Sequence, residues 1–167
     1  MAERQVVVDQ EKINYEGLFL IKDLIKIVYD WANDKGYVPL EPRHTEVIKD
    51  NIKTVEIDFT PYKKVTDFAK NLFQIKLTCS DITEVVIEQE GKRKKIDQGK
   101  VQIVFTAWLE TDYEQRWETK PIFYILRTAF EKYVYTPFLS GYRDAIRTDT
   151  TTLQDQFKSY LNLYKYV

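Results

Sequence analysis

An α+β fold with one antiparallel sheet is predicted by three features of this sequence. Apolar and polar residues alternate in several segments, short turn-like stretches connect these segments, and helical periodicities are confined to the two ends of the chain. Strands joined by short turns must pair antiparallel, and helices grouped at the ends most simply cover one face. We therefore expect a single α+β domain over residues 1–167, with about four to six strands packed on an N-terminal helix and two C-terminal helices.

The N-terminal part predicts a strand or arm followed by an amphipathic helix. Residues 6–8 are β-branched valines, so the segment 1–14 is interpreted as a short strand or an arm. Over about 17–34, apolar residues recur at three- and four-residue steps, which places them on one helix face. Gly36 follows the last turn, where a left-handed residue is expected.

The middle of the chain carries the strand patterns. Strands are expected over 44–48, 54–59, 73–79, 83–90 and about 100–110. The last of these is the longest, and apolar residues also occur on its second face, so we expect it to be central. Gly91 opens a turn, and the segment 92–95 is interpreted as the return arm or loop of that hairpin.

Two helices are predicted after the strands. Pro121 suits the first turn of a helix over 122–135, because that position needs no amide proton. Apolar and aromatic residues surround this helix almost completely, so it should be buried on most sides. A last helix is expected to begin at a cap formed by Thr148 or Asp149. Its packed stripe consists of Leu153, Phe157, Tyr160, Leu161 and Tyr164.

One segment reads Ala107-Trp108-Leu109-Glu110-Thr111-Asp112-Tyr113-Glu114 and continues with Arg116-Trp117-Glu118, and the C-terminal stretch reads Leu161-Asn162-Leu163-Tyr164-Lys165-Tyr166. With these stretches the chain resembles uncharacterised archaeal hypothetical proteins, and the resemblance spans most of its length. The resemblance implies no activity and no site residue.

Composition narrows the classes of function. The 25 basic and 26 acidic side chains leave a net charge of −1, so no global field draws the chain to nucleic acid or to a membrane. The single cysteine, Cys79, excludes an internal disulfide and a thiolate zinc cluster, and its place on an apolar strand face predicts a buried, inert thiol. Neither a secretory signal nor an apolar run of about 20 residues is seen, so we expect a cytoplasmic protein.

The sequence holds no recognisable catalytic motif. His44 is the one histidine, and an exposed or hydrogen-bonded structural role is favoured over that of a general base. Four carboxylates gather at and beyond the end of the longest strand: Glu110, Asp112, Glu114 and Glu118. They lack the glycine and the ligand spacing of a calcium loop, so ion pairs are favoured over a metal site. We therefore expect no cofactor, no metal and no enzymatic activity.

The concentrated basic feature is a candidate polyanion-binding site formed by Lys92, Arg93, Lys94 and Lys95. Basic side chains on a projecting hairpin can reach the phosphates of RNA. However, three carboxylates, Glu84, Glu88 and Glu90, stand on the partner strand. Cross-strand pairs would neutralise much of the cluster, so RNA binding is the less favoured outcome.

Aromatic residues suggest a second kind of surface. Twelve Tyr, nine Phe and three Trp exceed what an ordinary core requires. A candidate homodimer interface is formed by Phe123, Tyr124, Phe130 and Tyr133, although a core role fits these residues as well.

The favoured hypothesis is a non-enzymatic intracellular interaction module that binds protein, including a second copy of itself, or RNA. The alternative is a domain that holds a small apolar ligand between a curved sheet and a long helix, by analogy with helix-grip proteins. A large dry pocket between sheet and helices would favour the ligand hypothesis, and a filled core would favour the interaction hypothesis.

Overall fold

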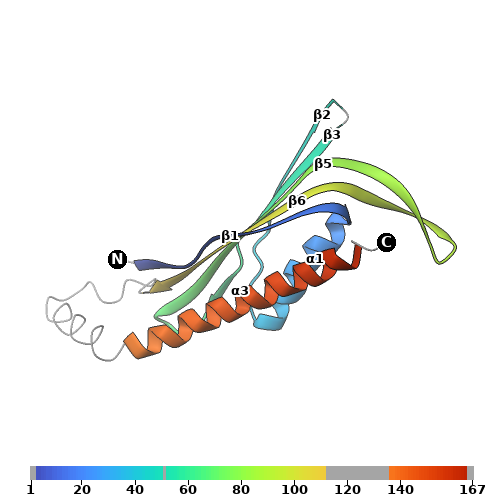
Figure 1. Ribbon diagram of the computed structural model, residues 1–167. Coiled ribbons are helices and arrows are strands. Elements are labelled where there is room, and N and C mark those ends of the chain that lie inside the picture. Colours follow the sequence, from blue (N-terminus) through green and yellow to red (C-terminus); the bar gives the residue numbers. More distant parts are fainter. Residues whose placement is uncertain (1–2, 51, 112–135, 165–167) are drawn as a thin grey trace, which may run out of the picture.

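The computed structural model describes residues 3–50, 52–111 and 136–164, which form one antiparallel sheet and two helices (Figure 1). The elements are β1 (Glu3–Phe19), α1 (Ile21–Lys35), β2 (Arg43–Lys49), β3 (Ile52–Phe59), β4 (Tyr62–Lys64), β5 (Ala69–Gln89), β6 (Lys92–Thr111) and α3 (Thr136–Tyr164). The strand order is β1-β6-β5-β3-β2, and β4 pairs with β5. The predicted α+β class is confirmed, whereas the helix expected over 122–135 lies outside the described residues.

Both described helices cover the same face of the sheet. Phe105 on β6 lies with its ring 6.0 Å from that of Phe157 on α3, and Trp31 on α1 lies 5.2 Å from Phe73 on β5. Phe73 pairs with Ala107, two residues from Phe105, so these side chains share one face. The helices themselves lie side by side along that face (Figure 1). Phe105 is fully buried, as its central position on the apolar face of the strand expected over 100–110 predicts.

The boundary between β1 and α1 differs from the sequence prediction. Residues 17–19 continue β1, because Gly17 pairs with Gly99 and Phe19 with Asp97 on β6. The helix therefore begins at Ile21. Leu20 offers its first turn no side-chain cap, and the Asp97 carboxylate accepts the Ile21 N–H instead. The C-terminal end is as predicted, with Gly36 in the left-handed conformation.

The two strands expected over 73–79 and 83–90 are one strand, β5. A bulge between Ser80 and Thr83 bends it without ending it, and Asp81 adopts a positive φ of 55° there. Gly99 on β6 faces this bulge, where an added Cβ would lie 2.7 Å from the Ser80 carbonyl oxygen. The bulge therefore approaches β6 at a distance that only glycine allows.

Of the two interpretations of segment 92–95, the return arm of the hairpin is confirmed and the loop is wrong, because these residues are the start of β6. They pair with 86–89 across a tight turn in which Glu90 and Gly91 both have positive φ, the conformation of a type I′ hairpin turn. The expected strand over 100–110 is therefore about eight residues longer at its N-terminal side, since β6 begins at Lys92.

The C-terminal helix is also longer than predicted, since α3 is continuous over 29 residues. Thr148 and Asp149 lie inside this helix and do not cap it. The hydroxyl groups of Thr148, Thr150, Thr151 and Thr152 each donate to the carbonyl oxygen four residues earlier. These hydrogen bonds within the helix satisfy a threonine-rich run that resembles a helix start. The predicted stripe is confirmed at Leu153, Phe157 and Leu161, which are buried.

Candidate functional site

The four basic residues of the hairpin do not form one patch. Adjacent side chains on a strand point to opposite faces, so Arg93 and Lys95 lie on one face of the β5–β6 ribbon and Lys92 and Lys94 on the other. Lys94 is opposite Ile87, an aliphatic residue. A phosphate chain on either face would therefore meet two of the four cations.

Acidic residues balance the charge of this hairpin. Lys95 Nζ lies 2.7 Å from Glu84 Oε1, and this hydrogen bond, with the negative charge of Glu84, raises the pKa of Lys95. Between residues 84 and 97 the four basic residues are matched by four carboxylates, Glu84, Glu88, Glu90 and Asp97. The neutralisation expected from the sequence is thus confirmed for the Glu84–Lys95 pair.

The other titratable candidates have structural surroundings. His44 is an exposed residue of β2, with Nε2 4.0 Å from Glu46 Oε2. Glu110 is buried, and its carboxylate receives Arg4 Nε at 2.8 Å and lies 3.8 Å from Lys70 Nζ. The other three carboxylates of that group lie outside the described residues. Within the described ranges no three His, Cys, Asp or Glu side chains are grouped so that they could hold a metal ion.

A buried polar cluster joins α1, β5 and α3, and sequence reasoning missed it. The Tyr37 hydroxyl donates to Asp149 Oδ2 at 2.8 Å, and the Asn71 amide donates to the Tyr37 oxygen at 3.4 Å. Lys35 Nζ lies 3.4 Å from Asp149 Oδ1, and Trp31 Nε1 donates to the Asp149 carbonyl oxygen. Burial raises the pKa of Tyr37, which keeps its hydroxyl protonated as a donor. These contacts connect α1 with α3 and attach both helices to β5. The sequence held one signal for this cluster: Asp149 lies one helical turn before Leu153, so it places a carboxylate on the apolar stripe of the last helix.

Cys79 is buried in the same core. Its burial, with a smaller contribution from the negative charge of Asp97, raises the pKa of the thiol to about 12. The thiol therefore stays protonated near neutral pH, which confirms the expectation of a buried cysteine and favours an inert one.

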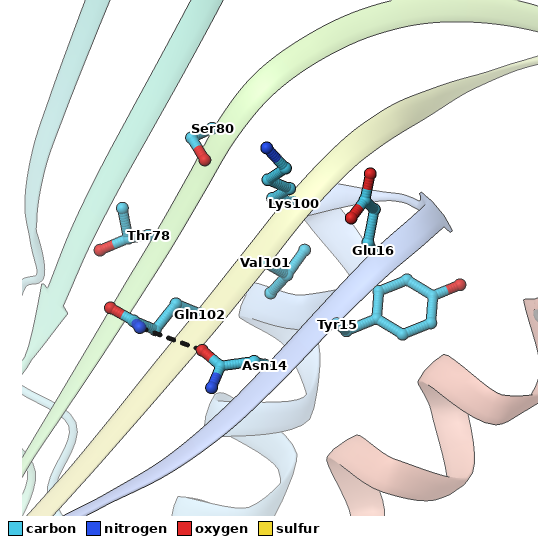
Figure 2. A pocket seen from close by; sticks show the side chains of 8 residues that line it. All are labelled: Asn14, Tyr15, Glu16, Thr78, Ser80, Lys100, Val101 and Gln102. Carbon is cyan, nitrogen blue, oxygen red and sulfur yellow. Dashed lines mark hydrogen bonds between the residues drawn. The ribbon is translucent and has the colours of Figure 1, made fainter.

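The open face of the sheet, opposite the helices, carries a depression of about 440 Å³ that polar and apolar residues line together (Figure 2). Asn14, Thr78, Lys100 and Gln102 line it, and the Gln102 amide donates to Asn14 Oδ1 at 3.0 Å. A second depression of about 210 Å³ shares Thr78 and extends over β3 to β2. Hydroxyls and charged side chains of both signs line both depressions, and both lie outside the layer between sheet and helices in which the ligand hypothesis places an apolar ligand.

The layer between sheet and helices is filled by side chains where the described residues meet. The rings of Trp31 and Tyr37 stack at 4.8 Å, and Phe73 contacts both edge-on. Phe105 and Phe157 meet further along the layer. Side chains therefore fill the layer at these two places.

The most exposed element of the sheet is its edge strand β2. All seven of its residues are exposed, and among the described residues no strand pairs with its outer side. Figure 1 shows that β2 and β3 form a hairpin that diverges from the β5–β6 ribbon, with β2 as its outer strand. Every second residue of such a strand turns its backbone N–H and C=O outward, ready to pair with another chain.

Exposed aliphatic residues are concentrated in the part of the chain that contains β2, and Val47 and Ile48 lie on the strand itself. Five of the eight large apolar residues that are exposed in the described part lie between residues 38 and 52: Val38, Leu40, Val47, Ile48 and Ile52. Val47 is 55% exposed and Ile48 67% exposed, and these neighbours point to opposite faces of the strand. Adjacent apolar residues without a buried face were the available signal for an edge strand in the sequence.

Neither a protein-family model, nor a curated protein, nor a solved structure matches this chain significantly. The resemblance to archaeal proteins therefore stays a prediction. The four aromatic residues of the candidate dimer interface, Phe123, Tyr124, Phe130 and Tyr133, lie outside the described residues. Neither α1 nor α3, the helices that the structure describes, combines the length and the apolar character needed to cross a membrane.

Proposed function

We propose that this chain is a non-enzymatic interaction module that binds a protein partner through the open edge of its sheet, strand β2. One observation carries the proposal: a complete edge strand whose seven residues are all exposed, including the aliphatic residues Val47 and Ile48, with exposed Ile52 on the adjacent strand β3. Native proteins usually protect such an edge with charges, bulges or a covering element. β2 carries the charged residues Arg43, Glu46 and Lys49, but among the described residues no element covers it, and an open, partly aliphatic edge is what strand addition by a partner requires.

Two contributions favour association at this edge. A partner strand would pair the outward backbone groups of β2, which gives affinity with little dependence on sequence. It would also cover Val47 and Ile48, and complete burial of one aliphatic side chain is worth about 1.5–3 kcal/mol. The charged residues of β2, such as Arg43 and Lys49, would then select among partners.

RNA and an apolar ligand are less well supported. The hairpin that carries 92–95 has as many carboxylates as cations and divides its cations between two faces. The two depressions lie on the open face, outside the layer in which the ligand hypothesis places the ligand, and charged residues of both signs line each of them. Aromatic rings fill that layer at two places among the described residues. A protein partner at the aliphatic edge is therefore the function that the geometry supports best.

The double substitution Val47→Lys and Ile48→Lys tests this function. It places charges on both faces of β2, so partners captured from an extract of the native host should fall at least tenfold by quantitative mass spectrometry. The free energy of unfolding should change by less than about 1 kcal/mol, because both side chains are exposed.

Two matched controls separate this edge from other surfaces. Val86→Lys introduces the same charge at an exposed aliphatic residue of the β5–β6 ribbon, and Ser at positions 92–95 removes the basic residues. Both controls should retain the partners of the wild-type protein. Equal capture by the edge variant, or loss of the partners together with RNA in the serine variant, would refute the proposal.

A further inference from the structure

We infer that β2 pairs antiparallel with β2 of a second copy of this chain, in the register that sets Thr45 opposite Thr45. The inference rests on the proposed function, because it names the partner of the same open edge. It joins the two sheets edge to edge around a two-fold axis.

Symmetry limits the registers that such a pair can adopt. In a two-fold interface, if residue i contacts residue j, then j contacts i. For two identical antiparallel strands the axis therefore passes between one residue and its own copy. Within β2 the central candidates are His44, Thr45, Glu46 and Val47.

The Thr45 register brings complementary side chains together. Within β2, His44 lies opposite Glu46 of the other copy. Extending the pairing by two residues before the start of β2 sets Glu41 opposite Lys49, and symmetry doubles both pairs. Opposite charges and Thr–Thr pairs across strands are both favourable. The imidazole N–H can donate to the Glu46 carboxylate, and a protonated imidazole adds an opposite charge.

Apolar contacts agree with the same register. Ile48, the most exposed aliphatic residue of β2, lies opposite Pro42, and Val47 lies opposite the aliphatic stem of Arg43. Within its own chain, Glu46 already receives Lys53 Nζ at 2.8 Å and lies 4.0 Å from His44 Nε2. A second His44 would therefore share this carboxylate with Lys53 of β3, on the inner side of β2.

The other registers oppose like groups or lose length. Centring on Glu46 sets Glu46 against itself and Arg43 against Lys49, and centring on His44 sets the imidazoles against each other. Like charges directly opposite are destabilising. Centring on Val47 pairs residues 45–49 and loses the His44–Glu46 pairs, and pairing cannot extend past Asp50, whose φ of 52° ends the extended strand.

Cysteine cross-linking of the full chain reads the register directly. In the inferred pair the Cβ atoms at position 45 are about 4.5–5.5 Å apart, so Thr45→Cys should form an interchain disulfide under mild oxidation. Val47→Cys is the matched control on the same face of the strand. Its two sulfurs would be displaced by about 13 Å along the strands, so it should not cross-link. Cys79 is buried and does not compete.

A charge exchange on the native cysteine background gives an independent test. Lys49→Glu alone and Glu41→Lys alone should each raise the dimer dissociation constant roughly tenfold at low salt, since two repulsive pairs replace two attractive ones. The double exchange restores both pairs and should return the constant to within about threefold of the wild-type value. Sedimentation velocity over a concentration series measures all four proteins.

Three results would overturn the inference. These are a wild-type monomer at every concentration up to millimolar, efficient cross-linking through Val47→Cys in place of Thr45→Cys, and single exchanges that leave the dissociation constant unchanged. Failure of the self-pairing is distinguishable from failure of the proposed function. If the Val47→Lys and Ile48→Lys variant still loses a captured protein, β2 binds another partner, and if it loses none, both proposals fail.

Discussion

Replacing Phe105 with alanine is expected to lower the free energy of unfolding by about 3–5 kcal/mol. Phe105 is fully buried on β6, between the paired strands β1 and β5, and its ring lies 6.0 Å from that of Phe157. The substitution removes a large apolar group and leaves a cavity that the strands on both sides cannot close. Urea unfolding, with the midpoint and slope compared between the two proteins, measures the loss.

The control for this prediction is the neighbouring residue on the same strand. Val104 is half-buried on the open face, so Val104→Ala should cost no more than about 1 kcal/mol. A loss below about 1 kcal/mol for Phe105→Ala, or equal losses for both variants, would contradict the assignment of the two sheet faces.

Trp31→Ala is expected to lower the free energy of unfolding by a similar amount, about 3–5 kcal/mol, because it removes the contacts of α1 with both β5 and α3. The indole is fully buried, stacks on Tyr37 at 4.8 Å, and donates from Nε1 to the Asp149 carbonyl oxygen on α3 at 2.9 Å. Trp31→Phe keeps an aromatic ring and removes this hydrogen bond, so it should cost about 1–2 kcal/mol.

The difference between the two substitutions tests the attachment of α1 to α3. Thermal unfolding followed by far-UV circular dichroism should rank the wild type first, then the Phe variant, then the Ala variant. Equal stability of the Phe and Ala variants would show that the ring contacts contribute little. A Phe variant as stable as the wild type would show that the hydrogen bond from Trp31 to the Asp149 carbonyl oxygen contributes nothing measurable to stability.

Local periodicity was sufficient to predict the strands whose neighbours agree with it. Val55, Ile57 and Phe59 alternate with polar residues and are all buried on one face of β3. The start of α1 was predicted too early, because Leu18 fits the helical stripe equally well. Pairing of residues 17–19 with β6 decided the conformation there, and such pairing is not visible in a local pattern.

Other features depended on distant residues and could not be read locally. Thr148 is a residue type that often caps helices, but α3 continues through it, and its hydroxyl donates to the backbone carbonyl oxygen of Asp144. The segment 83–90 follows a bulge, and β5 pairs with β6 on both sides of that bulge. The strand therefore continues where the sequence suggested that it ends. Whether β2 lies at an edge is a property of the sheet order, and residues 44–48 alone do not reveal it.

Amide hydrogen exchange across β2 tests the central claim, that this open edge is the interaction surface. Outward amides of an unpaired edge strand exchange quickly, and pairing with another strand slows them. Exchange should be compared between dilute protein and the associated state isolated from solution, whether with its own copy or with a captured protein. Association is expected to slow amide exchange over residues 43–49 and to leave the exchange rates of residues 92–95 unchanged. Unchanged exchange over 43–49, with protection confined to other segments, would contradict it.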